Sequence, residues 1–250
     1  MTLDGTNTYV IAAPGSGAAV IVDPGPDDPL HRQRVEEVLA CRDLACELVV
    51  VTHHHHDHTE AARAWADRFA CPVAAPSPRN IDDRVRPVAD GDRLVIGELT
   101  LEAVATPGHC SDHSAYRLPD GSLLVGDHIL GRGTAVVAFP DGDLVAYLAS
   151  LRKVLDLGPD TLHPGHGPEM AEDPAAVVRY YVEHRAFREH QILGILAEGV
   201  SRPADMVRRI YADVDPALWS PAEWSTRAAL AKLVADGRVA AAGDGFRLTV

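Results

Sequence analysis

The stretch from Thr52 to His58 constrains this 250-residue chain more than any other part of it. It reads Thr-His-His-His-His-Asp-His and contains four candidate metal ligands, which are His53, His55, Asp57 and His58. The apolar run Leu48–Val51 before it is typical of a buried strand. The segment Thr59–Trp65 after it is typical of the capped start of a helix. The four ligands are therefore predicted on a short loop at the carboxyl end of a strand, where open α/β sheets place their sites.

The spacing within this loop suits metal ions. Alternate side chains of an extended segment point the same way, so His53 and His55 can reach one ion together. Asp57 and His58 come after the chain turns into the helix and can face a second ion. Imidazole suits zinc, and one carboxylate adds charge without closing the site. The run is internal, which distinguishes it from an expression tag. The simpler alternative is a histidine-rich surface tract that binds metal adventitiously.

Three further candidate ligands follow predicted strands downstream. His109 follows Leu99–Val104, Asp127 follows Leu123–Val125, and His166 follows a short apolar segment. A glycine precedes each of them and lets the backbone turn sharply. All three can therefore converge at one sheet edge. The expected arrangement has one metal held by His53, His55 and His109, the other by Asp57, His58 and His166, and Asp127 bridging the two.

This ligand set resembles that of the metallo-β-lactamase superfamily, in its dinuclear form with a bridging aspartate. Five segments resemble the beta-lactamase-like protein 2 branch in particular: Met1–Thr8, Ile21–Pro26, Gly126–Gly131, Pro164–Pro168 and Val182–Arg185. The resemblance implies two zinc ions per chain, with other divalent metals as alternatives. It also favours Asp23 as a residue that holds the histidine loop by hydrogen bonds, although a turn before Pro24 is the simpler role. The resemblance implies about one more strand upstream in this branch; because the chain starts inside the Met1–Thr8 segment, its first edge strand is expected to be either missing or misannotated.

The order of predicted elements indicates an α+β fold. Strands interleaved with helices over residues 1–172 fit an αββα metallo-β-lactamase sandwich, with two sheets face to face and helices outside. Residues 173–250 read as helices followed by a closing hairpin and resemble a winged helix. Residues 180–250 hold nine Lys/Arg and nine Asp/Glu, which is a poor footprint for phosphate binding. Packing, dimerisation into a homo-oligomer or a pocket-wall role is expected for this region instead.

Charge and composition restrict the partners. The net charge of −13 opposes non-specific attraction to polyanions, whereas two zinc ions would make the pocket locally positive. No apolar run approaches the ~18 residues that a membrane helix needs, and the N-terminus has no signal-peptide core. No membrane partner and a cytoplasmic location are therefore expected. The four cysteines show no Cys-x-x-Cys spacing and are expected to pack as small apolar residues; Cys110 is not expected to be a ligand.

The expected chemistry is metal-dependent hydrolysis. Two ions would lower the pKa of a bound water and polarise the substrate oxygen. Asp57 would bind one ion and would also orient or accept the proton of that water. The branch resemblance implies phosphodiester hydrolysis, as in a single-strand endoribonuclease that takes single-stranded RNA. The alternative is hydrolysis of a small acyl-thioester or a hydroxyacylglutathione, since the ligand set also resembles that of glyoxalase II. A β-lactamase is less favoured because Asp127 stands where those enzymes use cysteine. A non-catalytic metal- or nucleic-acid-binding module is opposed by the intact ligand set.

Overall fold

The computed structural model describes residues 5–249, which form two compact units. The first unit comprises 5–106, 112–133 and 157–174, and the second comprises 107–111, 134–156 and 175–249. The expected domain boundary at residue 172 remains a prediction, and the second unit also takes in segments well before it. Met1–Asp4 of the resemblance motif, Val250 of the closing hairpin and the question of an extra first strand lie outside the described residues.

The first unit contains two five-stranded sheets. One has the order β1-β2-β3-β4-β5, and its strands are Tyr9–Ile11, Ala18–Val22, Ala45–Val50, Val73–Ala75 and Arg86–Pro87. The β1–β2 pair is antiparallel, and the remaining pairs are parallel. The other sheet has the order β10-β9-β8-β7-β6, and its strands in chain order from β6 are Arg93–Ile96, Leu99–Ala105, Ser114–Arg117, Leu123–Gly126 and Leu162–Pro164. Here only the β9–β10 pair is parallel.

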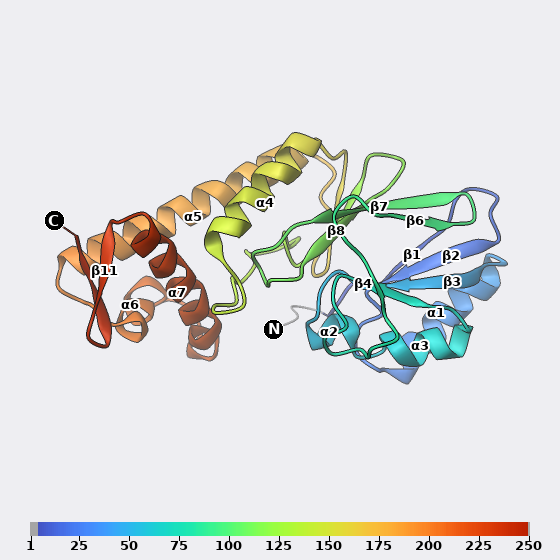
Figure 1. Cartoon of the computed structure of the whole chain (residues 1–250), viewed down its shortest axis with the longest axis horizontal. Coiled ribbons are helices and arrows are strands. Elements are labelled where there is room, and N and C mark those ends of the chain that lie inside the picture. Colours follow the sequence, from blue (N-terminus) through green and yellow to red (C-terminus); the bar gives the residue numbers. More distant parts are fainter. Residues whose placement is uncertain (1–4, 250) are drawn as a thin grey trace. The chain divides into compact units, whose positions relative to one another are not determined.

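The two sheets pack face to face through one apolar core. Strand β2 shows how the sequence produces this layer, because successive side chains of a strand point to opposite faces. Val20 and Val22 join Leu101 and Tyr116 of the other sheet in the central core. Ala19 and Ile21 point the other way and pack under the helices. Figure 1 shows α1 and α3 on the side of the first sheet that faces away from β6–β8, which gives the predicted layering.

The helices of the first unit are α1 (Pro29–Cys41), α2 (His56–Thr59) and α3 (Ala62–Phe69). The start of the helical segment differs from the prediction of a capped helix at Thr59. Helix α2 already begins at His56, and the Thr59 hydroxyl donates back to the His55 carbonyl inside the turn. Helix α3 begins without a side-chain cap; the Ala61 N–H donates to the Gly25 carbonyl instead. The four-residue turn therefore belongs to the histidine loop itself.

The second unit is mainly helical. It contains α4 (Leu144–Leu157), α5 (Pro174–Ala197), α6 (Pro203–Ile210), the 3₁₀ turn η1 (Pro216–Leu218), α7 (Trp219–Ala235) and the antiparallel hairpin β11 (Val239–Ala242) and β12 (Gly245–Leu248). Figure 1 shows α6, α7 and β11 gathered beside the later part of α5. Helices followed by a hairpin fit the expected winged helix. None of the helices in residues 5–249 is both long and apolar enough to cross a membrane.

Candidate metal centre

The histidine loop follows β3 directly. Thr52 and His53 are buried just beyond its end, and His55 is the last residue before α2. The short helix places Asp57 and His58 in its first turn, as the sequence reasoning expects of residues beyond the extended segment. His53 Nε2 lies 2.9 Å from His55 Nδ1, so the alternate histidines present ring nitrogens to one point.

Strands β9 and β10 bring two more candidates to the same edge of the first unit. These strands are parallel neighbours, with Pro164 opposite Gly126, so Asp127 and His166 leave the sheet side by side. Asp127 Oδ1 lies 3.4 Å from His58 Nε2 and 3.3 Å from His166 Nε2. Asp57 Oδ2 lies 3.2 Å from His166 Nε2 and 3.8 Å from His58 Nε2. The structure therefore brings together residues that are more than a hundred positions apart in the sequence.

These distances fit metal ligation better than they fit direct hydrogen bonding. His58 Nε2 and His166 Nε2 are buried and form no hydrogen bond. Two ligand atoms at 2.0–2.1 Å from a tetrahedral ion lie about 3.3 Å apart, which matches the separations of Asp127 Oδ1 from both imidazoles. Within the described residues of the first unit, two overlapping groups have the spacing of a metal site: His53, His58 and Asp127, and Asp57, His58 and His166. The spacing and the chemistry of these imidazoles and carboxylates therefore fit the binding of metal cations.

The cluster also favours positive charge electrostatically. Burial lowers the pKa of His58, but Asp23 and Asp127 outweigh this and hold it well above its ordinary value. Burial likewise opposes protonation of His166, yet Asp127 and Asp57 raise its pKa to about 10. The pKa of Asp127 is well below its usual range despite burial, because His58 and His166 stabilise the carboxylate. Metal ions bind neutral imidazole, so cations would replace these protons.

His109 belongs to the second unit, in the segment 107–111. The side chain is buried, and its Nδ1 donates to the Val136 carbonyl over 2.5 Å. A hydrogen bond at Nδ1 fixes the ring and leaves Nε2 for a ligand, as is usual for a histidine that binds metal. Its place in the metal site remains a prediction.

Asp23 lies where the hypothesis of a loop-holding residue requires it. Strands β2 and β3 are parallel neighbours with Val22 opposite Val50, so the residues after them meet. Asp23 Oδ1 accepts from the Thr52 N–H over 2.8 Å, and Oδ2 accepts from the Thr52 hydroxyl over 2.8 Å. Oδ2 also lies 2.9 Å from His58 Nδ1. The carboxylate thus fixes both the loop backbone and the orientation of His58.

Two further polar residues support the cluster. His113 accepts the Asp127 N–H at Nε2 over 3.1 Å, and its Nδ1 lies 2.8 Å from the Thr106 hydroxyl. Asn7 donates to the carbonyls of Pro164 and Gly167 over 3.0 and 2.7 Å. From the sequence alone, His113 can be either a turn residue or a residue that supports the ligands. For Asn7 the signal was present, because it lies in the Met1–Thr8 segment of the resemblance.

The glycines before the ligands act in different ways. Gly126 has φ +46 and Gly108 has φ +137, so both supply the sharp turn that the sequence predicts. Gly165 does not have a positive φ and is required for space instead. A Cβ at this position would lie 2.6 Å from Asp127 Oδ1 and 2.7 Å from His58 Cε1. The expectation of a turn-forming glycine is therefore wrong at Gly165, where the backbone approaches the ligands closely.

Comparison with known proteins identifies the family. The family description "Metallo-beta-lactamase superfamily" matches residues 1–166, and "Beta-lactamase associated winged helix domain" matches residues 203–247. The chain belongs to the metallo-β-lactamase superfamily. It is 32% identical to the Beta-lactamase-like protein 2 homolog of Drosophila melanogaster, over 96% of this chain and 85% of that protein. The resemblance drawn from the sequence, including its branch, is therefore confirmed.

Two other similarities bear on activity and on fold. The chain is 34% identical to Thioesterase pkgB of Emericella nidulans, over 79% of this chain and 56% of that protein. A metallo-beta-lactamase family protein from Thermus thermophilus superposes with a TM-score of 0.81 at 20% identity, over 99% of each chain. The second similarity confirms the α+β fold alone. The family is one of hydrolases, and the relative's name adds a specific class to be tested.

Proposed function

We propose that this protein is a metal-dependent thioester hydrolase with two divalent cations, most simply zinc. The observation that carries the proposal is the convergence of Asp57, His58, Asp127 and His166 at ligand-to-ligand distances of 3.2–3.8 Å. Three carboxylates, including Asp23, surround the buried imidazoles, so the site compensates positive charge. A cluster of this composition at strand ends suits metal-assisted hydrolysis.

We propose that the ligands would divide between two ions in the way that the sequence predicts. His53, His55 and His109 would hold one ion, and Asp57, His58 and His166 the other. Asp127 would reach both, because its Oδ1 already lies near His58 and His166 and it also groups with His53. Asp23 would keep His58 in the tautomer that presents Nε2 to the metal, since Nδ1 faces the Asp23 carboxylate.

The bound ions would supply Lewis acidity and an activated water. Asp57 is the residue placed to handle the proton. Its side chain is 26% exposed, whereas those of His58 and His166 are almost fully buried, so it faces the accessible side of the cluster. Burial raises its pKa, but contacts with His166 and His58 outweigh this and the net shift is downward. Asp57 is therefore ionised at neutral pH and can orient the attacking water and accept its proton.

A thioester is the substrate class that the molecule favours. Over 79% of its own length, this chain is similar to a protein named as a thioesterase, of which it covers 56%. The net charge of −13 is unfavourable for a polyanion but acceptable for a small activated acyl group. We also propose that the protein acts in the cytoplasm, where acyl-thioesters are available.

Phosphodiester hydrolysis is the second candidate, and the winged-helix match favours it. Winged helices commonly present a helix to nucleic acid. The balance of nine basic and nine acidic residues in 180–250 lacks the basic stripe that such binding requires. Single-stranded RNA therefore ranks below a small thioester as substrate, which reverses the order suggested by the sequence resemblance alone.

The two candidates can be separated with one set of variants. The purified, metal-loaded protein is assayed on an acyl-coenzyme A, an S-acylglutathione and a short single-stranded RNA. We expect thioester hydrolysis that a chelator abolishes and added zinc restores, with little RNA cleavage. Asp127→Ala should lower kcat/KM by more than about a hundredfold, because even outer contacts of a metal site cost 10–100-fold.

Asp67→Ala is the matched control, because Asp67 is 57% exposed and pairs with Arg63 and Arg84, away from the cluster. It should retain full activity. RNA cleavage that depends on Asp127 while both thioesters remain intact would replace the first candidate with the second. Activity that persists in Asp127→Ala would show that the metal cluster is not the catalytic site.

A further inference from the structure

Two arginines of α5 lie in the second unit without an acidic partner, Arg185 buried and Arg188 half-buried. Arg185 is 6% exposed; its Nη2 donates to the Ala135 carbonyl over 2.5 Å, and its guanidinium lies 4.9 Å from the Tyr147 ring centroid. Arg188 lies one turn further along the same face of the helix. Its guanidinium lies 4.6 Å from the Tyr211 ring centroid, and its Nη1 donates to Gln191 over 2.7 Å.

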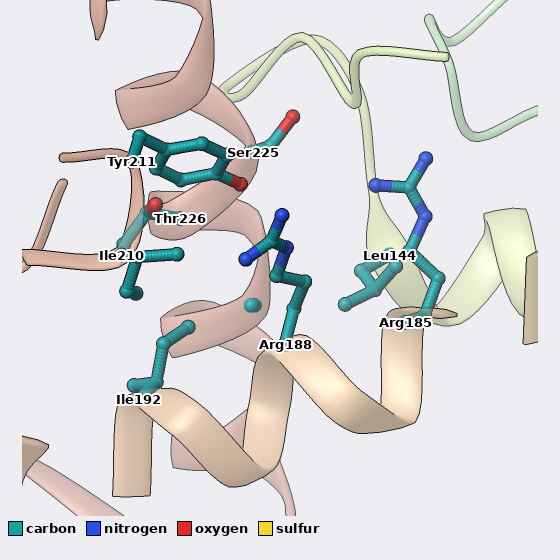
Figure 2. A pocket seen from close by; sticks show the side chains of 9 residues that line it. Leu144, Arg185, Arg188, Ile192, Ile210, Tyr211, Ser225 and Thr226 are labelled. Carbon is teal, nitrogen blue, oxygen red and sulfur yellow. The ribbon is translucent and has the colours of Figure 1, made fainter. Parts of the chain in front are cut away.

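The two side chains border a small hollow that is partly open to solvent. Its wall comes from α4, α5, α6 and α7 and includes Leu144, Ile192, Tyr211, Ser225 and Thr226. Figure 2 shows both guanidinium groups rising from α5 on the same side, with Arg188 under the Tyr211 ring and Leu144 between the arginines. Apolar and hydroxyl groups therefore surround the cationic ends.

The nearby carboxylates are already engaged. Glu189, which is buried on the same helix, lies 3.0 Å from Lys232 Nζ. Glu223 accepts two hydrogen bonds from Arg227. Within residues 5–249, no carboxylate forms an ion pair with Arg185 or Arg188, and the Nε atoms of both are buried without a hydrogen-bond partner. Two cations are thus held in the protein with unused donors.

Such an arrangement is costly unless a ligand compensates it. A buried charge is normally paired, because removal from water costs several kcal/mol that only a counter-charge recovers. The positive field is visible at the neighbouring His184, whose pKa is lowered to about 4 by burial, Arg185 and Arg188. Guanidinium donors match the oxygens of phosphate and carboxylate, and the bonds between charged groups are the strong ones.

We propose that this hollow binds an oxyanion, specifically a phosphate group, with Arg188 at its centre and Arg185 beside it. Ser225 supplies a further donor, because its Oγ accepts the Val137 N–H over 3.1 Å and its own hydrogen stays available. Phosphate is favoured over carboxylate because it offers more acceptor oxygens to this set of donors. The alternative is that the arginines only join α5 to the neighbouring helices.

The site is independent of the proposed hydrolase activity. Every residue of the hollow belongs to the second unit, and none is a candidate metal ligand. Loss of phosphate binding would therefore leave the catalytic proposal intact, and an inactive metal centre would leave the phosphate site intact.

The direct test follows the Nε–H groups of Arg185 and Arg188, which have no hydrogen-bond partner in the protein. The full-length, metal-loaded protein carrying ¹⁵N-arginine is titrated with inorganic phosphate at constant ionic strength, and the Nε–H signals are followed by NMR. Acetate serves as a parallel titrant for carboxylates. We expect the Arg185 and Arg188 signals to shift together and saturate with phosphate, and to respond less to acetate. Because the signals come from these two arginines, the titration distinguishes phosphate bound in the hollow from phosphate bound at the metal centre.

Arg188→Met retains most of the side-chain stem and removes the charge. It should weaken phosphate binding, read at the Arg185 signal, by about tenfold or more, because one bond between charged groups is lost. Arg152→Met removes an exposed arginine from α4 and should bind phosphate like the wild type. Unmoved Nε signals in the wild type, an equal loss in both variants, or a stronger response to acetate would overturn the proposal.

Discussion

Buried charge is compensated within the first unit, whereas in the second unit part of it is not. In the first, His58 and His166 lie within 3.8 Å of the carboxylates of Asp57 and Asp127, and Asp23 supports His58 from behind. In the second, Arg185 and Arg188 lie among aromatic, aliphatic and hydroxyl groups. One cluster combines both signs of charge around space for a cation, and the other presents only positive charge.

The difference shows how each site would recognise its ligand. The metal cluster depends on backbone turns at strand ends, so its precision comes from close packing of loops around the ligands. The arginine pair depends on two residues of one long helix, and its specificity comes from charge and donor geometry. Variants that disturb packing should therefore damage the first unit far more than the second.

The largest difference is expected between two glycine substitutions. Gly165→Ala places a Cβ 2.6 Å from Asp127 Oδ1 and 2.7 Å from His58 Cε1, and both groups are fixed by their own contacts. Activity should fall by more than about a hundredfold, since a 1 Å misplacement in an active site has that cost. Gly194 lies in α5 with nothing within 4 Å of the added atom, so Gly194→Ala should stabilise the protein by about 0.5–1 kcal/mol. Kinetics and chemical denaturation check the pair.

A smaller effect is expected behind the metal ligands. Asp23→Asn keeps the shape of the side chain but removes the charge that faces His58 Nδ1 at 2.9 Å. Metal affinity should fall by about 10–100-fold, as for other outer contacts of metal sites. Asp28→Asn is the control, because Asp28 is exposed and caps α1, where asparagine serves equally well. Competition with a chromophoric chelator measures both, and equal affinities would remove Asp23 from the metal site.

The smallest effect concerns pH and the second unit. His184 has a pKa of about 4 when folded, against 6.5 in an exposed histidine, because burial and the two arginines disfavour its charged form. Between these two pKa values, His184 binds more protons in the unfolded chain than in the folded protein. The contribution of His184 to the free energy of unfolding is therefore at its full value above pH 6.5 and decreases as the pH falls toward 4. The pH dependence of denaturant unfolding should be less steep in His184→Gln than in the wild type over this window. An unchanged profile would show that folding does not lower the pKa of His184.

Much of the first unit follows from local sequence signals. Apolar strand patterns place β3, β7 and β9 correctly, and glycines and strand ends identify Asp127 and His166 as members of one cluster. These signals are local, because a strand and its following turn are encoded within about ten residues. The start of the helix after the histidine loop differs from the prediction, because the four-residue helix α2 begins at His56 and takes the place of the cap expected at Thr59.

The remaining features depend on contacts that no local pattern encodes. His113 supports Asp127 only because β8 and β9 are neighbours in the second sheet. Gly165 is needed for space rather than for its conformation, which becomes visible only once His58 and Asp127 are placed around it. Arg185 belongs to a segment of the resemblance and Arg188 follows it closely, yet nothing in the sequence shows that their acidic neighbours pair elsewhere.

The central claim is that the clustered histidines and aspartates hold two metal ions. Elemental analysis of the purified protein after zinc loading and dialysis tests it most directly. We predict about two ions per chain in the wild type and in Asp67→Ala, with fewer than about one in Asp127→Ala, because that side chain would serve both ions. A wild-type protein that retains no metal, or an Asp127→Ala variant that retains both ions, would contradict the account.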